Sequence, residues 1–209
     1  MSETVVQLPV VTRRRRMTDR QAQTVTRLLD AAADELAEVG YPSLAIRDVA
    51  ARAGVAPATA YTYFASKEHL VAEMFWRRIA MQPPTKVDRR RSPTARATDV
   101  LLEFSLAVVG ETELAAACTL GLLADDPEVR EMRARMGATL HERLAAALGS
   151  EVNASTITAL ELLTTGVLLQ AGTGHIPYSQ VPSVLAEMAG VVLDGWDIAA
   201  SRSRSGGRG

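Results

Sequence analysis

The chain has 209 residues, 47% of them hydrophobic, and a formal net charge of −1. That length suits one compact domain, or two small ones sharing a boundary, with a sizeable core. A single cysteine, Cys118, and three histidines exclude an internal disulfide and a Cys/His zinc cluster, so we expect neither a metal nor a cofactor. No apolar run reaches the roughly 18 residues of a spanning helix, and no apolar stretch follows the N-terminal arginines. These features predict a soluble, cytoplasmic protein without a membrane partner.

Charge is distributed unevenly along the chain. Residues 1–100 hold 16 Lys and Arg against 11 Asp and Glu, whereas residues 101–209 hold 7 against 13. A basic front half suggests that this half meets a polyanion such as nucleic acid. The alternative is that the four arginines at 13–16 form a solvated tail with no specific role.

The front of the chain reads as a series of short helices. Thr18 carries a capping-box signature, and Gly40 ends the apolar helical pattern that follows it. A short second helix ends at Gly54, and Pro57 suits the first position of a third. Ser66 is a candidate cap for the fourth helix. We therefore expect a basic, disordered arm over 1–17 and a three-helix domain over 18–66.

The rear of the chain reads as a helical bundle. A proline- and arginine-rich linker covers 82–93, and four or five longer helical patterns follow it, the first from about Thr94 to Val109. No alternating strand pattern of useful length occurs. The sequence therefore predicts an all-α fold of about nine helices, with a bundle over 67–200 and a disordered Arg/Ser/Gly tail over 201–209.

Residues 46–64 have the pattern of a helix-turn-helix. Gly54 permits the abrupt turn, and Ala60 and Phe64, four residues apart, are expected to pack inward. Most of the remaining side chains of the second helix are small or carry hydroxyls, which suits close approach to bases and phosphates in a major groove. The alternative is that Tyr61 and Tyr63 are core aromatics with solvated hydroxyls.

These residues resemble the TetR family of transcriptional regulators. The resemblance covers about Arg20 to Trp76 and includes Gly40-Tyr41, Ile46–Ala50, Ala53-Gly54-Val55 and the run from Tyr61 to Glu68. Two departures stand out: Ala45 and Ala56 occupy positions where the family commonly has Ser or Thr. Ser43 is a candidate to replace the cap at Ala45, and otherwise a phosphate contact is missing there.

The resemblance implies a ligand-responsive regulator, most commonly a repressor, that binds a palindromic operator in double-stranded DNA as a homodimer. Two recognition helices would lie about one DNA turn, ~34–36 Å, apart. A small apolar effector would enter the rear bundle and shift the helix that begins at Ser66. The last two long helices would form the dimer interface, through Leu160, Leu163, Val167, Val184, Leu185, Met188 and Val192. Candidate effector contacts are Phe104, Cys118, Met136 and Thr164.

The DNA-binding candidates are Arg47, Pro57, Ala58, Thr59, Tyr61, Thr62, Tyr63 and Lys67. Arg47 is the candidate for a bidentate contact to guanine, because the recognition helix itself has no Arg, Lys, Asn or Gln. Its alanine and threonines would meet thymine methyls, while the two tyrosines and Lys67 would hold phosphates. Arginines 13–16 either enter the minor groove or remain solvated.

A second interpretation is a helical enzyme or small-molecule carrier with a helix pair that binds no DNA. The sequence contains no GxSxG, no phosphate-binding loop, no His/Glu metal pair and no GxGxxG at a helix start. We therefore expect no enzymatic activity.

Overall fold

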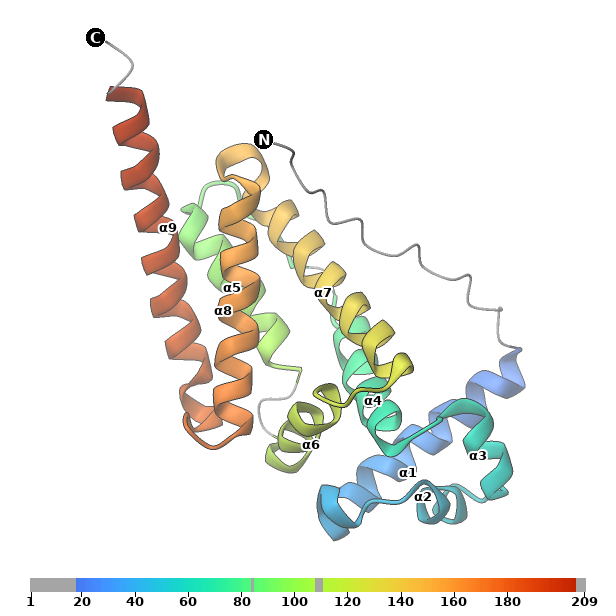
Figure 1. Cartoon of the computed structure of the whole chain (residues 1–209). Helices are drawn as coiled ribbons and strands as arrows, with labels where there is room; N and C mark the ends of the chain where they lie inside the picture. The colour runs from blue at the N-terminus through green and yellow to red at the C-terminus, as the bar shows by residue number, and fades with distance from the viewer. Residues whose placement is uncertain (1–17, 84, 108–110, 206–209) are drawn as a thin grey trace.

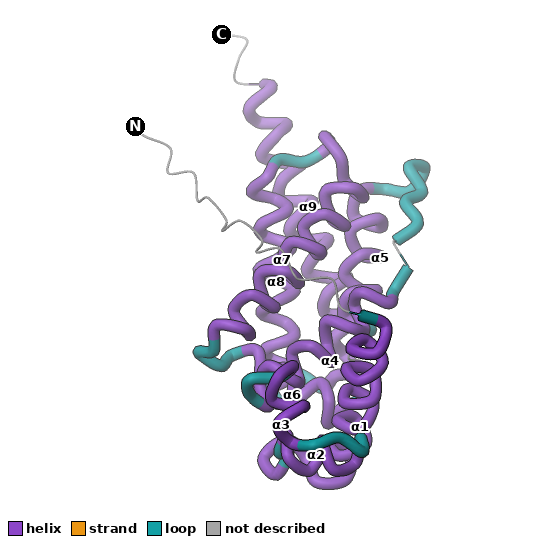
Figure 2. The backbone as a smooth tube through the Cα atoms, turned by 90° about the vertical axis from the view of Figure 1, so that its right-hand side faces the viewer, coloured by secondary structure: helices purple, strands orange, loops and turns teal. Residues whose placement is uncertain are grey.

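The structure is a computed structural model that describes residues 18–83, 85–107 and 111–205. The predicted arm over 1–17, with its four arginines, lies outside the described residues. Within them the fold is all-α, and strands are absent (Figures 1 and 2). The α-helices are α1 (Asp19–Ser43), α2 (Ile46–Arg52), α3 (Pro57–Tyr63), α4 (Lys67–Met81), α5 (Pro93–Ser105), α6 (Thr112–Leu122), α7 (Pro127–Leu148), α8 (Ala154–Gly172) and α9 (Val181–Ser205).

The first three helices form a small unit, which we call the head (residues 18–66). The predicted capping box begins α1: the Gln21 N–H donates to Thr18 Oγ1 at 3.3 Å, and the Thr18 N–H donates to Gln21 Oε1 at 2.9 Å. Gly40 interrupts α1 with a φ of 69°, as its position at the end of the apolar pattern predicts. Leu28, Leu36 and Val49 are buried between α1, α2 and their neighbours.

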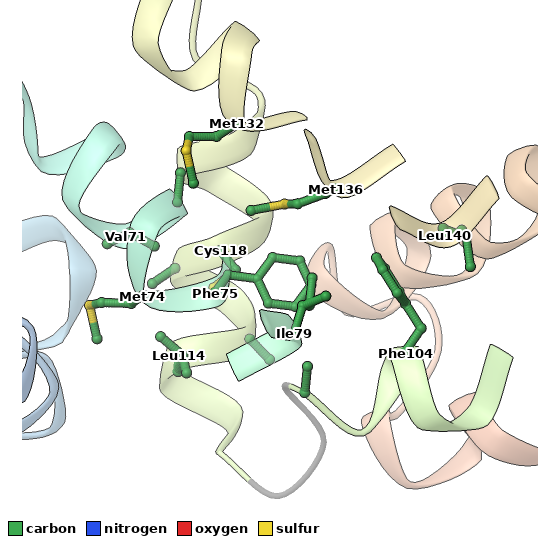
Figure 3. Packing of buried hydrophobic residues seen from close by; sticks show 14 of the residues in the cluster. Val71, Met74, Phe75, Ile79, Phe104, Leu114, Cys118, Met132, Met136 and Leu140 are labelled. Carbon is green, nitrogen blue, oxygen red and sulfur yellow. The ribbon is translucent and has the colours of Figure 1, made fainter. Parts of the chain in front are cut away.

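The remaining described helices form the bundle (residues 67–205). α4 joins the two units, because it packs on α1 in the head and on α6 and α7 in the bundle. Figure 3 shows this junction, where Val71, Met74 and Phe75 of α4 meet Cys118 of α6 and Met136 of α7. α8 and α9 pack side by side along one edge, and α5 packs on α7 and α9 (Figure 1). α6 therefore contacts the head directly through α1, whereas α7 is connected to it through α4.

Three expectations need correction. α9 continues to Ser205, so the first five residues of the predicted disordered tail are helical, while 206–209 lie outside the described residues. Arginine is a good helix former, which allows α9 to extend beyond its apolar portion. α5 ends at Ser105, before the predicted end at Val109, which is itself outside the described residues. α8 has the length and composition of a membrane-spanning helix, contrary to expectation, but it packs against α6, α7 and α9.

Candidate functional site

The turn between α2 and α3 places α3 on the outside of the head. Gly54 adopts a φ of 67°, a conformation that favours glycine, and the Val55 N–H donates to the Ala50 carbonyl at 3.0 Å. Ala60 and Phe64 of α3 are buried, with exposed fractions of 0% and 2%, as their spacing predicts. α3 is therefore anchored along one side and presents its other side to solvent.

The outward side of α3 carries small and hydroxyl-bearing residues. Pro57, Ala58, Tyr61 and Thr62 are exposed, and Thr59 and Tyr63 are partly buried. Tyr61 is 54% exposed, which rules out a core role for this residue, whereas Tyr63 does pack against the core. Thr62 donates its hydroxyl hydrogen to the Ala58 carbonyl at 3.0 Å, so its lone pairs remain available outside.

Arg47 and Arg52, on the same short helix, differ in their partners. The Arg47 side chain is 76% exposed, and its ion pair with the neighbouring Asp48 is a long one, at 3.4 Å. Arg52 is held by Glu35 at 2.8 Å and by Glu38 at 2.5 Å. Hydrogen bonding to these two carboxylates raises the pKa of Arg52, and the same contact lowers the pKa of Glu38. Arg47 is thus the arginine of α2 that can reach a base.

Lys67 contacts the protein rather than projecting freely toward a phosphate. Its Nζ donates to the carbonyls of Tyr41 and Pro42, at 3.1 and 3.2 Å, and lies 4.6 Å from the centre of the Tyr41 ring. The Tyr41 hydroxyl in turn donates to Glu68 Oε1 at 3.1 Å. Burial, followed by the Glu68 charge, raises the pKa of Tyr41. Lys67 therefore fastens the start of α4 to the end of α1.

The two expected departures at helix starts are present in the structure. Ala45 and Ala56 precede α2 and α3 without any side-chain hydrogen bond. Ser43 does not replace the missing cap, contrary to one expectation, because it forms the last residue of α1. Ser66, however, caps α4 as predicted, by accepting from the His69 N–H at 3.0 Å.

A cavity of about 240 Å³ lies in the bundle between α4, α5, α6, α7 and α8. The four candidate effector contacts, Phe104, Cys118, Met136 and Thr164, all line it. Figure 3 shows Phe75, Phe104, Met136 and Leu140 from three of these helices gathered in this region. α6 and α8 approach so closely beside it that a Cβ on Gly172 would clash with the side chain of Thr119. Glycine is therefore required at that contact.

The threonine hydroxyls and the arginine around the cavity already have partners, whereas the buried Tyr178 hydroxyl, which also lines it, has none among the described residues. Thr119, Thr164 and Thr165 each donate their hydroxyl hydrogen to a carbonyl of their own helix, at 2.7 to 3.1 Å. The Nη1 hydrogens of Arg133 are donated to the carbonyls of Leu122 and Ala124. Burial raises the pKa of the Cys118 thiol, which keeps it neutral. The cavity therefore offers apolar surface and a few hydroxyl lone pairs.

A hydrogen bond that the sequence does not reveal connects two helix starts. Ser66, the cap of α4, donates its hydroxyl hydrogen to Asp126 Oδ2 at 2.6 Å. Asp126 is itself the cap of α7, since its Oδ1 accepts from the N–H groups of Glu128 and Val129. The bond from Ser66 contributes most to lowering the pKa of Asp126. Because α7 lines the cavity and α4 follows α3, this bond joins the cavity wall to the head.

The predicted dimer residues fall into two groups. Leu160, Val167 and Leu185 are buried inside the chain, so they belong to its own core and not to an exposed interface. Leu163, Val184, Met188 and Val192 remain partly exposed. α8 is apolar almost all round, so spacing alone does not identify its outer side. Sequence reasoning did not single out Leu162 on α8 and Val191 on α9, two apolar residues that are 68% and 62% exposed.

The fold and the outward-facing α3 define a helix-turn-helix DNA-binding protein. Residues 28–74 match the family described as bacterial regulatory proteins, tetR family. Proteins of Mycobacterium bovis and Mycobacterium tuberculosis, each named as an uncharacterized HTH-type transcriptional regulator, are 42% identical over 178 residues, covering 84% of this chain and 83% of theirs. The chain belongs to the TetR family of transcriptional regulators, and it is not an enzyme.

Solved structures share the fold at low sequence identity. A TetR transcriptional regulator from Rhodococcus sp. RHA1 is 22% identical with a TM-score of 0.68, over 84% of this chain and 98% of that one. Thermus thermophilus FadR, solved in complex with lauroyl-CoA, is 18% identical with a TM-score of 0.60, over 82% and 94%. At these identities the likeness shows the fold alone.

Proposed function

We propose that this regulator is a cytoplasmic, homodimeric repressor that binds a palindromic operator and leaves it when a small apolar molecule occupies the bundle cavity. One observation carries the proposal: two helices that line the cavity lead to the head. α6 packs directly on α1, and both α6 and α7 pack on α4, which begins where the head ends. An effector that binds the cavity more tightly in the released state than in the DNA-bound state shifts the equilibrium toward release. The size of the shift equals the difference between the two binding free energies.

The effector class follows from the chemistry of the cavity wall. Its threonine hydroxyls and its arginine are already hydrogen bonded within the protein, so a charged ligand would have to break those bonds or rely on the Tyr178 hydroxyl alone. An uncharged or weakly charged apolar molecule, such as an acyl or polycyclic compound, meets no such cost. Thermus thermophilus FadR was solved with lauroyl-CoA, whose lauroyl chain is apolar although its CoA part carries phosphates.

The second copy of the chain is proposed to cover the exposed side of α8 and α9. Leu162 and Gly166 lie four residues apart on α8, and Val184, Met188 and Val191 follow the same helical spacing on α9. Only 33% of α8 is buried within the chain, although it is apolar enough to prefer burial. Pairing this surface with its copy removes apolar area from water and holds two heads together.

The operator is best found by selecting bound duplexes from a random pool with the full chain. A selected palindrome with half-sites about one turn apart supports the dimer, whereas an asymmetric site or no enrichment contradicts the proposal. Lauric acid and phenanthrene, as two apolar probes, should raise the melting temperature and release the selected duplex. Stabilisation by a polyanionic metabolite, with none by lipophilic probes, would contradict the effector class.

Coupling between the cavity and the head is tested at Asp126. Asp126→Ser keeps a side-chain cap for α7 but removes the oxygen that accepts from Ser66. Such a variant should still be stabilised by the apolar probe, yet release DNA only at several-fold higher probe concentration. Glu128→Gln, an exposed change in the same turn, is the matched control. Unchanged release by Asp126→Ser would show that the hydrogen bond does not carry the signal.

A further inference from the structure

A polar groove of about 450 Å³ runs between the start of α1 and the helix-turn-helix. Its walls come from one side of α1 and from the turn with the adjoining side of α3, which lie close together (Figure 1). The lining residues are Thr18, Arg20, Gln21, Thr24, Arg27, Gly54, Val55, Ala56, Thr59 and Tyr63. Thr59 and Tyr63 are already candidate DNA contacts, so the groove extends the surface of α3 toward α1.

The α1 wall of the groove carries a regular row of side chains. Arg20, Thr24 and Arg27 stand at positions i, i+4 and i+7, which places them on one side of the helix. Both arginines are exposed, and within the part of the chain that the structure describes neither guanidinium contacts a carboxylate. Thr24 donates its hydroxyl hydrogen to the Arg20 carbonyl at 2.9 Å, so it adds no free donor.

Other arginines near the groove do have carboxylate partners. Arg52 has two carboxylate partners, and Arg77 of α4 pairs with Asp30 of α1 at 3.1 Å. Arg47 has one long ion pair, with Asp48 at 3.4 Å. Arg20 and Arg27 are therefore the arginines of the head that have no carboxylate partner among the described residues. Two unpaired guanidinium groups facing one polar groove would repel each other less if an anion lay between them.

We propose that Arg20 and Arg27 form a second DNA contact, a clamp on the phosphate backbone beside the major groove that α3 enters. The inference rests on the DNA binding of the family and adds a site on α1. The groove's position decides the occupant: it is continuous with the outward side of α3, so a duplex that engages α3 brings its backbone to α1. Guanidinium groups bind phosphate oxygens with two parallel hydrogen bonds, which also fixes the register of the duplex.

The test compares Arg20→Gln, Arg27→Gln and Arg90→Gln in the full chain. Arg90 is an exposed arginine of the linker between α4 and α5. Because it lies outside the groove, its substitution removes one positive charge without changing the groove and is the matched control. Binding is measured by fluorescence anisotropy on the selected duplex and on a scrambled duplex of equal length, across a salt series. Far-UV circular dichroism and melting temperature verify that each variant folds.

Each groove variant should weaken both duplexes by a similar factor, about three- to tenfold at low salt, since phosphates carry no sequence information. The salt slope should fall by about 0.9 for every phosphate that the variant no longer binds, while Arg90→Gln leaves it unchanged. Arg27→Lys should restore most of the slope, because a lysine also meets a phosphate as a point charge.

Two results would overturn the clamp. Groove variants with wild-type slopes on both duplexes would show that α1 does not meet the backbone. Weakening confined to the selected duplex would assign these arginines to base reading instead. If the wild type bound neither duplex, the operator-binding proposal itself would fail. If the wild type bound and Arg20→Gln and Arg27→Gln bound equally well, only the clamp would fail.

Discussion

In the head, Arg20, Arg27 and Arg47 present their guanidinium groups to solvent, whereas two arginines of the bundle bind carbonyls within the chain. There Arg133 binds two carbonyls at the end of α6, and Arg143 bridges from α7 to the Ile79 carbonyl at 3.0 Å. All of these side chains are positively charged, but those of the head face solvent and those of the bundle bind carbonyl groups. A chain with a net charge of −1 thus keeps free positive charge at one end, where a polyanion can reach it.

The two regions also differ in where their apolar surface goes. The head buries most of its aliphatic and aromatic side chains, although Val39 and Tyr61 are 40% and 54% exposed. The bundle leaves Leu162 and Val191 exposed on adjacent helices and keeps an apolar cavity inside. The head thus presents the DNA-binding surface, and we propose that the bundle meets a second copy and a small molecule. Substitutions in the head should weaken DNA binding directly, whereas substitutions at the proposed dimer surface should weaken it by separating the two heads.

The largest effect is expected from breaking the proposed dimer surface. The double variant Leu162→Glu with Val191→Glu should be monomeric by light scattering, because carboxylates from both copies would enter an apolar interface. It should bind the operator more than about 100-fold more weakly, since two heads no longer share one site. Leu106→Glu, at a 55% exposed residue after α5, is the control. A double variant that stays dimeric would reject this surface.

Arg47→Ala should have the next largest effect. Removal of a bidentate guanine contact costs about 1–3 kcal/mol per half-site and relaxes preference at one base pair. Repeating the duplex selection with the variant measures that preference directly. If all sequences weaken alike, Arg47 holds a phosphate, and specificity comes from Thr59, Thr62 or the shape of the DNA.

Gly137→Leu should separate effector response from DNA binding. Gly137 lines the cavity, and a Cβ there meets nothing within 4 Å, so a leucine side chain can occupy the space. DNA affinity should stay close to that of the wild type, while the affinity for an apolar probe, measured by the melting shift, falls about tenfold. Ala138→Leu, at the next, exposed residue, is the matched control. A full response in Gly137→Leu would place the effector elsewhere.

The head is more predictable from sequence than the bundle, for physical reasons. Turn residues such as Gly54 and caps such as Thr18 and Ser66 act locally, so their spacing defines the helices that they begin or end. The four candidate effector contacts also line the cavity, although Met136 and Thr164 belong to the helical patterns of α7 and α8. α8, by contrast, is apolar on nearly every side, and only packing shows that Leu160 faces inward and Leu162 outward.

Long-range contacts of single side chains are beyond the sequence. Ser66 and Asp126 each suit a helix start, but nothing in their spacing shows that residues 60 positions apart share a hydrogen bond. The place of Lys67 in the recognition pattern predicts a phosphate contact. Its partners within the protein are instead carbonyls that only the fold at Gly40 brings within reach.

The smallest expected effect tests which of the two roles Lys67 performs. As a fastening between α4 and α1, it should contribute about 1 kcal/mol to the free energy of unfolding, because its hydrogen bonds are partly exposed. Lys67→Ala should therefore lower the melting temperature by a few degrees and leave the salt slope of DNA binding near the wild-type value. As a phosphate contact it would do the reverse: the slope would fall by about 0.9 for one phosphate while thermal stability stayed unchanged. Lys67→Arg sharpens the distinction, since arginine can meet a phosphate but its planar group does not fit the two carbonyls and the Tyr41 ring in the same way. Retained DNA affinity with reduced stability in Lys67→Arg would assign Lys67 both roles: a fastening in the free protein and, through its remaining N–H, a backbone contact on DNA.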